Sequence, residues 1–188
     1  RLNQKHPGAY YNRAIAYAAL GQYEKAVVGY RQAIHLRPDF ADAYVNLGSL
    51  QIRRGEYQEA IQSCTQAIRL KPRDPNGYYN RGEAYLKLGR YQQAIEDFSV
   101  VVRLQPGDYE AYYHRGIAYG KIDRTRSEIE DYSQTLQLKP DYAQALNSRA
   151  ASYFRQDEKL SGCRDAKAAC KLGVCQTLEG ARTRGICR

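Results

Sequence analysis

The chain has 188 residues, and its 29 Lys or Arg against 20 Asp or Glu give a formal net charge of +9. It contains no apolar stretch long enough to span a membrane and no secretory signal, so we expect no membrane span and favour a cytoplasmic location. The positive charge favours acidic partners such as peptides, nucleic acid or anionic lipid, and a solvated basic surface explains it equally well.

In chain order, the first regular feature is a proline that recurs every 34 residues, each preceded two positions earlier by a leucine. A fixed period of this length is typical of stacked helical repeats rather than of one globular core. We therefore divide the chain into a lead-in 1–6, repeats 7–40, 41–74, 75–108 and 109–142, a degenerate fifth repeat 143–176 and a capping segment 177–188.

Each repeat opens with a predicted helix whose packing positions are spaced by four and then three residues, which places them on one helix face. The middle position is always Gly or Ala, and such small residues let a neighbouring helix approach closely. The three sets of equivalent positions are Tyr10, Tyr44, Tyr78, Tyr112 and Leu146; Ala14, Gly48, Gly82, Gly116 and Ala150; and Tyr17, Gln51, Tyr85, Tyr119 and Tyr153.

This helix is expected to end at Gly21, Gly55, Gly89 and Asp123, since glycine tolerates the left-handed backbone that ends helices. A second helix follows and stops before the proline, which cannot continue a helix. Its first packing position is Ala in three repeats, Glu128 in the fourth and Gly162 in the fifth. The acidic pairs 96–97 and 130–131 are interpreted as solvated positions on its outer face.

These repeats resemble the tetratricopeptide repeat (TPR) family, whose consensus W-x2-L-G-x2-Y…A-x3-F…P is met at Tyr78, Arg81, Gly82, Tyr85, Ala94, Phe98 and Pro106. Tyrosine replaces the tryptophan throughout, and arginine replaces the leucine at Arg13, Arg81, Arg115 and Arg149. The resemblance covers about 170 of the 188 residues. It implies an all-α fold, namely a right-handed α-solenoid of tandem antiparallel helix pairs, and no enzymatic activity.

The resemblance also implies that the first helices line a concave groove. One face of each first helix takes no part in packing and lies about 100° from the packing positions. This face carries tyrosines and amides and, two turns later, cations. Tyr rings offer flat apolar area, Asn amides can bond to a peptide backbone, and Lys or Arg can bind carboxylates. The predicted groove residues are Tyr11, Asn12, Asn46, Arg53, Tyr79, Asn80, Lys87, Tyr113, His114 and Lys121. Equally favoured is that the asparagines bond to backbone between helices.

Five cysteines raise the question of a metal or disulfide. Cys64, Cys163 and Cys170 fall at apolar packing positions and are expected to be small buried residues. Cys175 and Cys187 flank the capping segment, so a Cys175–Cys187 disulfide is expected in an oxidising compartment but not in a reducing one. No histidine follows His114, so zinc is not favoured, and we expect no metal and no cofactor.

We interpret the chain as a protein-interaction scaffold that binds a peptide segment of a partner, in particular an acidic one, in its groove. The chaperone-binding dicarboxylate clamp of the family is not predicted, because only Asn46 agrees with its pattern. One alternative is single-stranded nucleic-acid binding through residues 143–188, which hold nine Lys or Arg against four acids, although this charge is diffuse. Another is self-association through the ends of the array.

Overall fold

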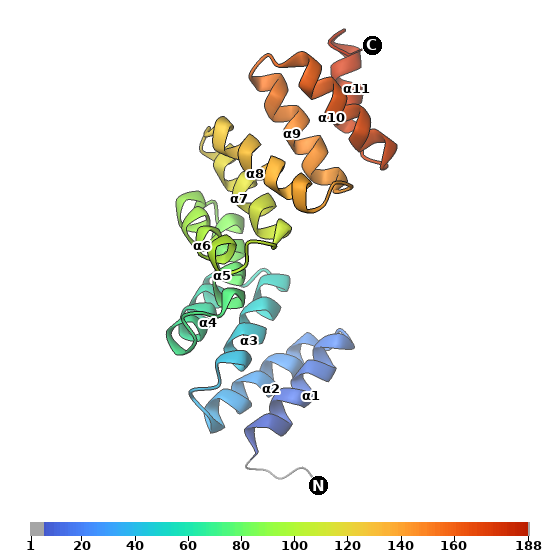
Figure 1. The fold of residues 1–188 in the computed structure, drawn as a ribbon. Coiled ribbons are helices and arrows are strands. Elements are labelled where there is room, and N and C mark those ends of the chain that lie inside the picture. Colours follow the sequence, from blue (N-terminus) through green and yellow to red (C-terminus); the bar gives the residue numbers. More distant parts are fainter. Residues whose placement is uncertain (1–5, 188) are drawn as a thin grey trace. The chain divides into compact units, whose positions relative to one another are not determined.

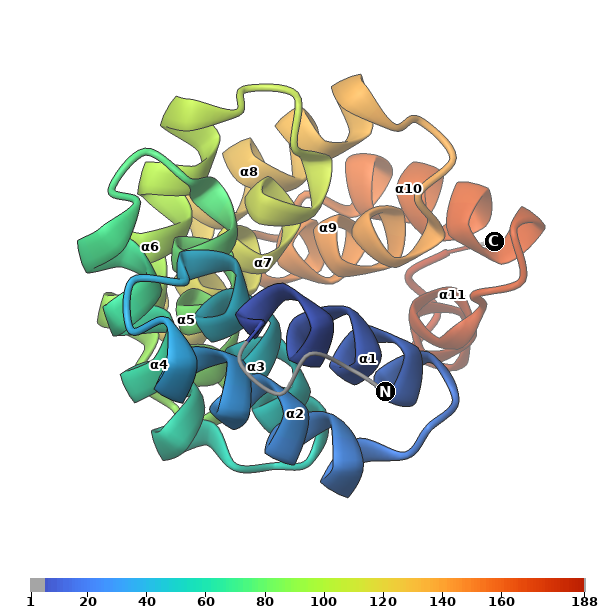
Figure 2. The ribbon, with the colours of Figure 1, turned by 90° about the horizontal axis from the view of Figure 1, so that it is seen from below.

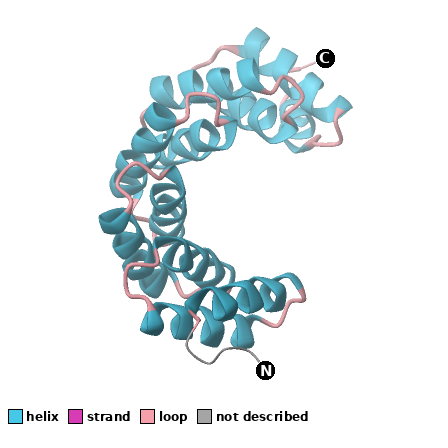
Figure 3. Ribbon diagram, turned by 60° about the horizontal axis from the view of Figure 1, so that its bottom comes forward, coloured by secondary structure: helices cyan, strands magenta, loops and turns pink. Residues whose placement is uncertain are grey.

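In the computed structural model, the described residues 6–187 form eleven helices and no strand. Figure 3 shows these residues coloured as helices and loops. The predicted all-α fold, an α-solenoid of helix pairs, is confirmed. The helices are α1 Pro7–Ala19, α2 Tyr23–Leu36, α3 Ala41–Arg53, α4 Tyr57–Leu70, α5 Pro75–Lys87, α6 Tyr91–Leu104, α7 Tyr109–Lys121, α8 Thr125–Leu138, α9 Ala143–Arg155, α10 Lys159–Lys171 and α11 Gln176–Thr183.

The chain divides into two compact units, which we treat separately. Unit 1 is Arg1–Leu104 and contains α1 to α6, and unit 2 is Gln105–Arg188 and contains α7 to α11 (Figure 1). The boundary falls between α6 and α7.

Within each helix pair the two helices are joined by a short turn and pack along their length, as α1 does on α2 and α3 on α4 (Figure 2). The turn requires a left-handed residue, and Gly55 supplies it with φ 79°. Where glycine is missing, Asp123 and Asp157 adopt φ 58° and 60°. Aspartate is among the residues that tolerate this conformation best, so the predicted helix end survives the substitution.

The small packing positions allow the close helix contact that the sequence predicts. A Cβ atom added at Gly48 would lie 2.5 Å from Cys64 Sγ, and one added at Gly116 would lie 2.8 Å from the Tyr132 ring. Cys64 is fully buried, as expected for its packing position. In the second, third and fourth pairs, a side chain of the second helix therefore rests on a glycine of the first: Cys64 on Gly48, Phe98 on Gly82 and Tyr132 on Gly116.

Asp97 and Asp131 are buried, with 4% and 5% of their surface exposed, so their interpretation as solvated positions is wrong. Arg81 donates from Nε and Nη2 to both Asp97 carboxylate oxygens at 2.8 Å. Arg115 binds Asp131 in the same way at 2.8 and 2.7 Å. Arg81 and Arg115, which replace the consensus leucine, thus supply bidentate partners, and the hydrogen bond to Asp97 raises the pKa of Arg81.

The segment after α10 forms the short helix α11, which packs on α9 and α10. Its Leu178 and Ala181 are buried against Ala150 and Ala166. This helix covers the apolar side of the last helix pair, as a terminal repeat requires.

Two disulfides hold α11, and neither is the expected Cys175–Cys187 bond, so that expectation is wrong. Cys163 pairs with Cys187, and Cys170 pairs with Cys175. The turn after α11 brings Cys187 back onto α10, and the loop after α10 places Cys175 beside Cys170. Cys163 and Cys170 are consequently bonded cysteines rather than simple apolar packing residues.

Candidate functional site

Unit 1 has two adjoining hollows between successive first helices. The α1–α3 hollow has a volume of about 320 Å³ and the α3–α5 hollow about 400 Å³. Asn46 and Ser49 of α3 line both, so the two hollows meet along this helix. Their linings are Ile15, Ala18, Ala19, Tyr30, Asn46, Ser49, Leu50 and Arg53 for the first, and Tyr11, Asp42, Val45, Asn46, Ser49, Asp74, Asn76 and Asn80 for the second.

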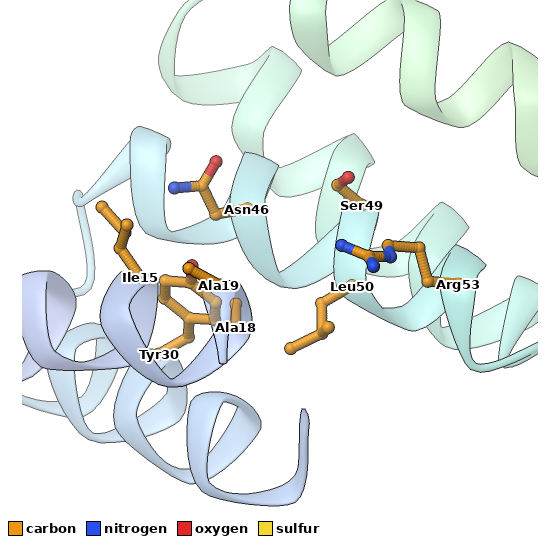
Figure 4. A pocket seen from close by; sticks show the side chains of 8 residues that line it. All are labelled: Ile15, Ala18, Ala19, Tyr30, Asn46, Ser49, Leu50 and Arg53. Carbon is orange, nitrogen blue, oxygen red and sulfur yellow. The ribbon is translucent and has the colours of Figure 1, made fainter. Parts of the chain in front are cut away.

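The α1–α3 hollow has an apolar floor and a polar edge (Figure 4). Tyr30 and Leu50 are each only 3% exposed, whereas Ile15 on α1 is 41% exposed. The small side chains of Ala18 and Ala19 leave the space open. This arrangement can bury an apolar side chain while polar groups of α3 face the chain that carries it.

Arg53 is the cation of this hollow and is held in place by Tyr23 of α2. Its guanidinium carbon lies 4.8 Å from the centre of the Tyr23 ring, and its Nη2 donates a hydrogen bond to the Tyr23 hydroxyl. The residue is exposed to solvent. A guanidinium positioned on a ring in this way can bind a carboxylate with less loss of side-chain entropy than a freely rotating one.

Two of the three asparagines that line the hollows, Asn46 and Asn80, connect neighbouring first helices. Asn46 donates from Nδ2 to the Tyr11 hydroxyl at 2.9 Å, and Asn80 donates from Nδ2 to the Val45 carbonyl at 3.3 Å. The interpretation that the asparagines bond to backbone between helices therefore holds for Asn80, whereas Asn46 bonds to a side-chain hydroxyl of the neighbouring helix. Tyr11 also belongs partly to the core, since its ring centre lies 4.7 Å from that of Phe40, and burial raises its pKa.

Carboxylates mark the end of the site opposite Arg53, and the sequence interpretation missed them. Asp42 accepts a hydrogen bond from Lys71 Nζ at 2.7 Å, which raises the pKa of Lys71. Asp74 accepts from the Asn76 backbone N–H at 3.0 Å and from its side-chain amide at 2.8 Å. A usable signal exists in the sequence, because Asp42 lies one helical turn before Asn46 on the same face.

The structure brings together Tyr11, Asn46, Arg53 and Asn80 of the predicted groove. The others lie elsewhere: Tyr79 packs edge-on against Phe98 with ring centres 5.7 Å apart, and Asn12 and Lys87 are exposed outside the two hollows. Tyr113, His114 and Lys121 belong to unit 2, where Tyr113 packs against Tyr132 and Tyr142. Ser49, which lies on the predicted face, was not among the predicted residues.

Over the described residues 6–187, no group of three or more His, Cys, Asp or Glu side chains is arranged to hold a metal ion. Over the same range, no helix combines the length and the apolar character needed to cross a membrane. The chemistry available to the two hollows is therefore that of their amides, hydroxyls, carboxylates, guanidinium and apolar floor.

Comparison with solved structures shows that the fold is shared. The structure "Crystal structure of MamA protein" is 22% identical, with 88% of this chain and 91% of that chain covered and a TM-score of 0.82. MamA 41-end from Desulfovibrio magneticus RS-1 is 21% identical, covering 92% and 97%, with a TM-score of 0.85. YrrB, described as a TPR protein with an unusual peptide-binding site, is 19% identical, covering 96% and 94%, with a TM-score of 0.83.

Comparison with curated protein sequences gives no match. Comparison with family models does: a model described as TPR repeat matches residues 16–53 and 48–89, and a model described as Tetratricopeptide repeat matches residues 75–108. These matches cover helices α2 to α6 completely. The sequence repeats, the helix pairs and these models agree, and the chain belongs to the tetratricopeptide repeat family.

Proposed function

We propose that this chain is a non-catalytic protein-interaction scaffold, and that unit 1 binds an extended segment of a partner protein along α3. The observation that carries the proposal is that two hollows meet at Asn46 and Ser49, so that one segment can contact both. The family and the peptide-binding description of YrrB support this choice of ligand class.

The length of the bound segment follows from the helix that supports it. Asp42 and Arg53 are eleven residues apart on α3, which corresponds to about 16 Å along the helix axis. An extended peptide rises about 3.3 Å per residue, so about five residues fill this distance. The apolar floor at Tyr30 and Leu50 accepts an apolar side chain near the Arg53 end.

The charges of the site set the direction of the segment. Arg53 favours an acidic side chain or a terminal carboxylate at one end, and Asp42 with Asp74 favours a basic group at the other. Asn46, Ser49 and Asn80 lie between and suit a peptide backbone. The partner segment we propose therefore carries charges of both signs, whereas the net charge of the chain favours an acidic partner.

A selection from a random library of eight-residue peptides, followed by affinity measurements on the winners, tests this assignment. Ser49→Trp fills the shared part of both hollows and is expected to weaken binding at least tenfold. Gln62→Trp is the matched control, because Gln62 lines a different hollow between α3 and α4, beside Tyr44. Equal affinity of Ser49→Trp and the parent chain would reject the site, provided that both variants retain the parent's helix content.

The charge assignment is tested separately with the same peptides. Arg53→Glu is expected to lose the peptides with an acidic end and to gain those with a basic residue in its place. Unchanged selectivity would show that Arg53 does not contact the segment. Titration with single-stranded RNA at two salt concentrations examines the nucleic-acid alternative, which predicts binding that weakens steeply as salt rises.

A further inference from the structure

Unit 2 contains a hollow of about 260 Å³ between α9 and α11, and no groove residue predicted from the sequence lines it. Ala151, Phe154 and Arg155 form the α9 side, and Thr177, Gly180 and Arg184 lie on the α11 side. The α9 residues occupy the same repeat positions as Ile15, Ala18 and Ala19 in the α1–α3 hollow of unit 1. The opposite wall differs, because α11 belongs to none of the five repeats.

The floor of this hollow is apolar and fixed. The Phe154 ring rests on Gly162, where an added Cβ would lie 2.5 Å from the ring, so the ring has little freedom to move. Gly180 faces open space, since a Cβ added there would have no heavy atom within 4 Å. The floor can therefore accept one small or medium apolar side chain.

Two guanidinium groups flank the floor. Arg184 donates from Nε to the Gly180 carbonyl at 3.0 Å, which orients the base of the group. Arg155 donates from Nη2 to the buried Glu128 carboxylate, yet 52% of its side chain remains exposed. Glu128 balances one of the two positive charges, and the net charge contributed by these three residues is +1. This balance favours an anionic group above the floor.

The α11 wall is attached to α9 and α10 by two disulfides and a hydrogen bond. Cys170–Cys175 joins α10 to the residue before α11, and Cys163–Cys187 joins α10 to the turn after it. The N-terminus of α11 is docked on α9, where the Thr177 N–H donates to Asn147 Oδ1 at 3.3 Å. A helix of eight residues does not persist alone in water, so this wall requires its attachments.

We propose that the hollow between α9 and α11 binds an apolar residue of an acidic peptide together with a neighbouring carboxylate, and that the two disulfides maintain the site. Charge complementarity supports an acidic occupant, because residues 143–188 hold nine Lys or Arg against four Asp or Glu. The carboxylate can belong to a side chain or to a chain end, and both bind a guanidinium in the same way.

The direct test is an NMR titration of the oxidised, ¹⁵N-labelled chain with acetyl-Gly-Leu-Glu-Asp. We expect saturable shifts of the Thr177 and Gly180 amide signals. The neutral peptide acetyl-Gly-Leu-Gln-Asn-amide should produce no shifts. Acetyl-Gly-Leu-Glu-Asp-amide keeps the side-chain carboxylates but lacks the terminal one, so it shows which kind of carboxylate is bound. Equal shifts with the neutral peptide, or shifts confined to other residues, would overturn the proposal. Tighter binding of oligo(dT) at the same residues would assign the site to nucleic acid instead.

Arginine variants test the charge contact with the same peptide. Arg184→Gln is expected to weaken binding about tenfold, as loss of a charge-assisted hydrogen bond does. Lys171→Gln is the matched control, since Lys171 is an exposed cation of α10 that does not line the hollow. Equal weakening in both variants would show attraction by overall charge only and would contradict a specific pocket.

Cysteine variants test the role of the disulfides. Two double variants each remove one disulfide: Cys170→Ser/Cys175→Ser and Cys163→Ser/Cys187→Ser. We expect each to lower the affinity for the tetrapeptide at least tenfold, whereas Cys64→Ala keeps the affinity of the parent. Undiminished binding in both double variants would refute the role of the disulfides. Binding of the library peptides in unit 1 should persist in these variants, so failure here is distinguishable from failure of the proposed function.

Discussion

The two units share one repeat but are stabilised differently. Unit 1 buries Cys64 as a free thiol, and its second repeat places Leu47 and Ser63 where later repeats have arginine and aspartate. The third repeat of unit 1 has one such pair, Arg81–Asp97, whereas unit 2 contains two, together with a buried glutamate and two disulfides. The difference teaches that a repeat tolerates a charged residue at a packing position when an opposite charge neutralises it. The opposite charge comes from the same helix pair or from the next one.

Glu128 shows how this compensation operates. It occupies a position that is alanine in the first three repeats, and it is only 4% exposed. Gly120 provides the space, since a Cβ there would lie 2.5 Å from the glutamate Oε1. Arg155 of α9 neutralises the charge. Burial, and next the Glu128 charge, raise the pKa of the adjacent Tyr132, which keeps that hydroxyl protonated.

The largest expected effect is on the free energy of unfolding. It compares the Arg149–Asp165 ion pair with the Leu47 and Ser63 side chains that the second repeat has at the same positions. Asp165→Ala leaves Arg149 partly buried without its bidentate partner, and we expect a loss of about 3–5 kcal/mol in the free energy of unfolding. Urea denaturation followed by circular dichroism measures it. The double variant Arg149→Leu/Asp165→Ser reproduces the second repeat and should remain within about 1.5 kcal/mol of the parent. A double variant as unstable as Asp165→Ala would contradict this account of the difference.

The next largest expected effect is the stability lost when a disulfide of unit 2 is removed. The Cys163–Cys187 bond closes a longer loop, with a separation of 24 residues against 5 for Cys170–Cys175. In the chain-entropy model their loss costs about 3.5 and about 2 kcal/mol respectively. Denaturation of the two Cys→Ser double variants checks the order. Equal stability of both variants and the parent would show that the bonds do not stabilise unit 2.

A smaller effect distinguishes the members of the Glu128–Arg155 pair. Arg155→Ala leaves a carboxylate buried without its partner and is expected to cost about 2 kcal/mol. Glu128→Ala restores the residue of the first three repeats, and Arg155 is exposed enough to be hydrated, so the cost should stay below about 1 kcal/mol. The reverse order in denaturation experiments would contradict the compensation argument.

The smallest expected effect concerns the Cys64 thiol, which should not react with an alkylating reagent in the native chain. Burial raises the pKa of Cys64 to about 12, so at pH 8 the thiol is protonated as well as inaccessible. The native oxidised chain should resist alkylation, and after denaturation without reductant it should show one thiol, with five after reduction. A count of five thiols without reductant would show that the disulfides are absent, as expected for a protein kept in a reducing compartment.

The sequence predicts the helices well because each repeat encodes its own start, turn and end. It does not reveal the Arg81–Asp97 pair, whose members lie 16 residues apart on two helices and become neighbours only when the helices pack. The cysteine pairing was missed for a similar reason, since the path of α11 follows no repeat position. In the site, Asn46 and Arg53, and Asp42 one turn before Asn46, follow from helix periodicity, whereas Asp74 required the contact between α3 and α5.

The most direct test of the central claim is a crystal structure of the chain with the tightest peptide from the library. The account predicts an extended peptide along α3, in contact with Asn46 and Ser49, with its acidic group at Arg53. A peptide seated instead against Tyr44 and Gln62, in the hollow between α3 and α4, would contradict it.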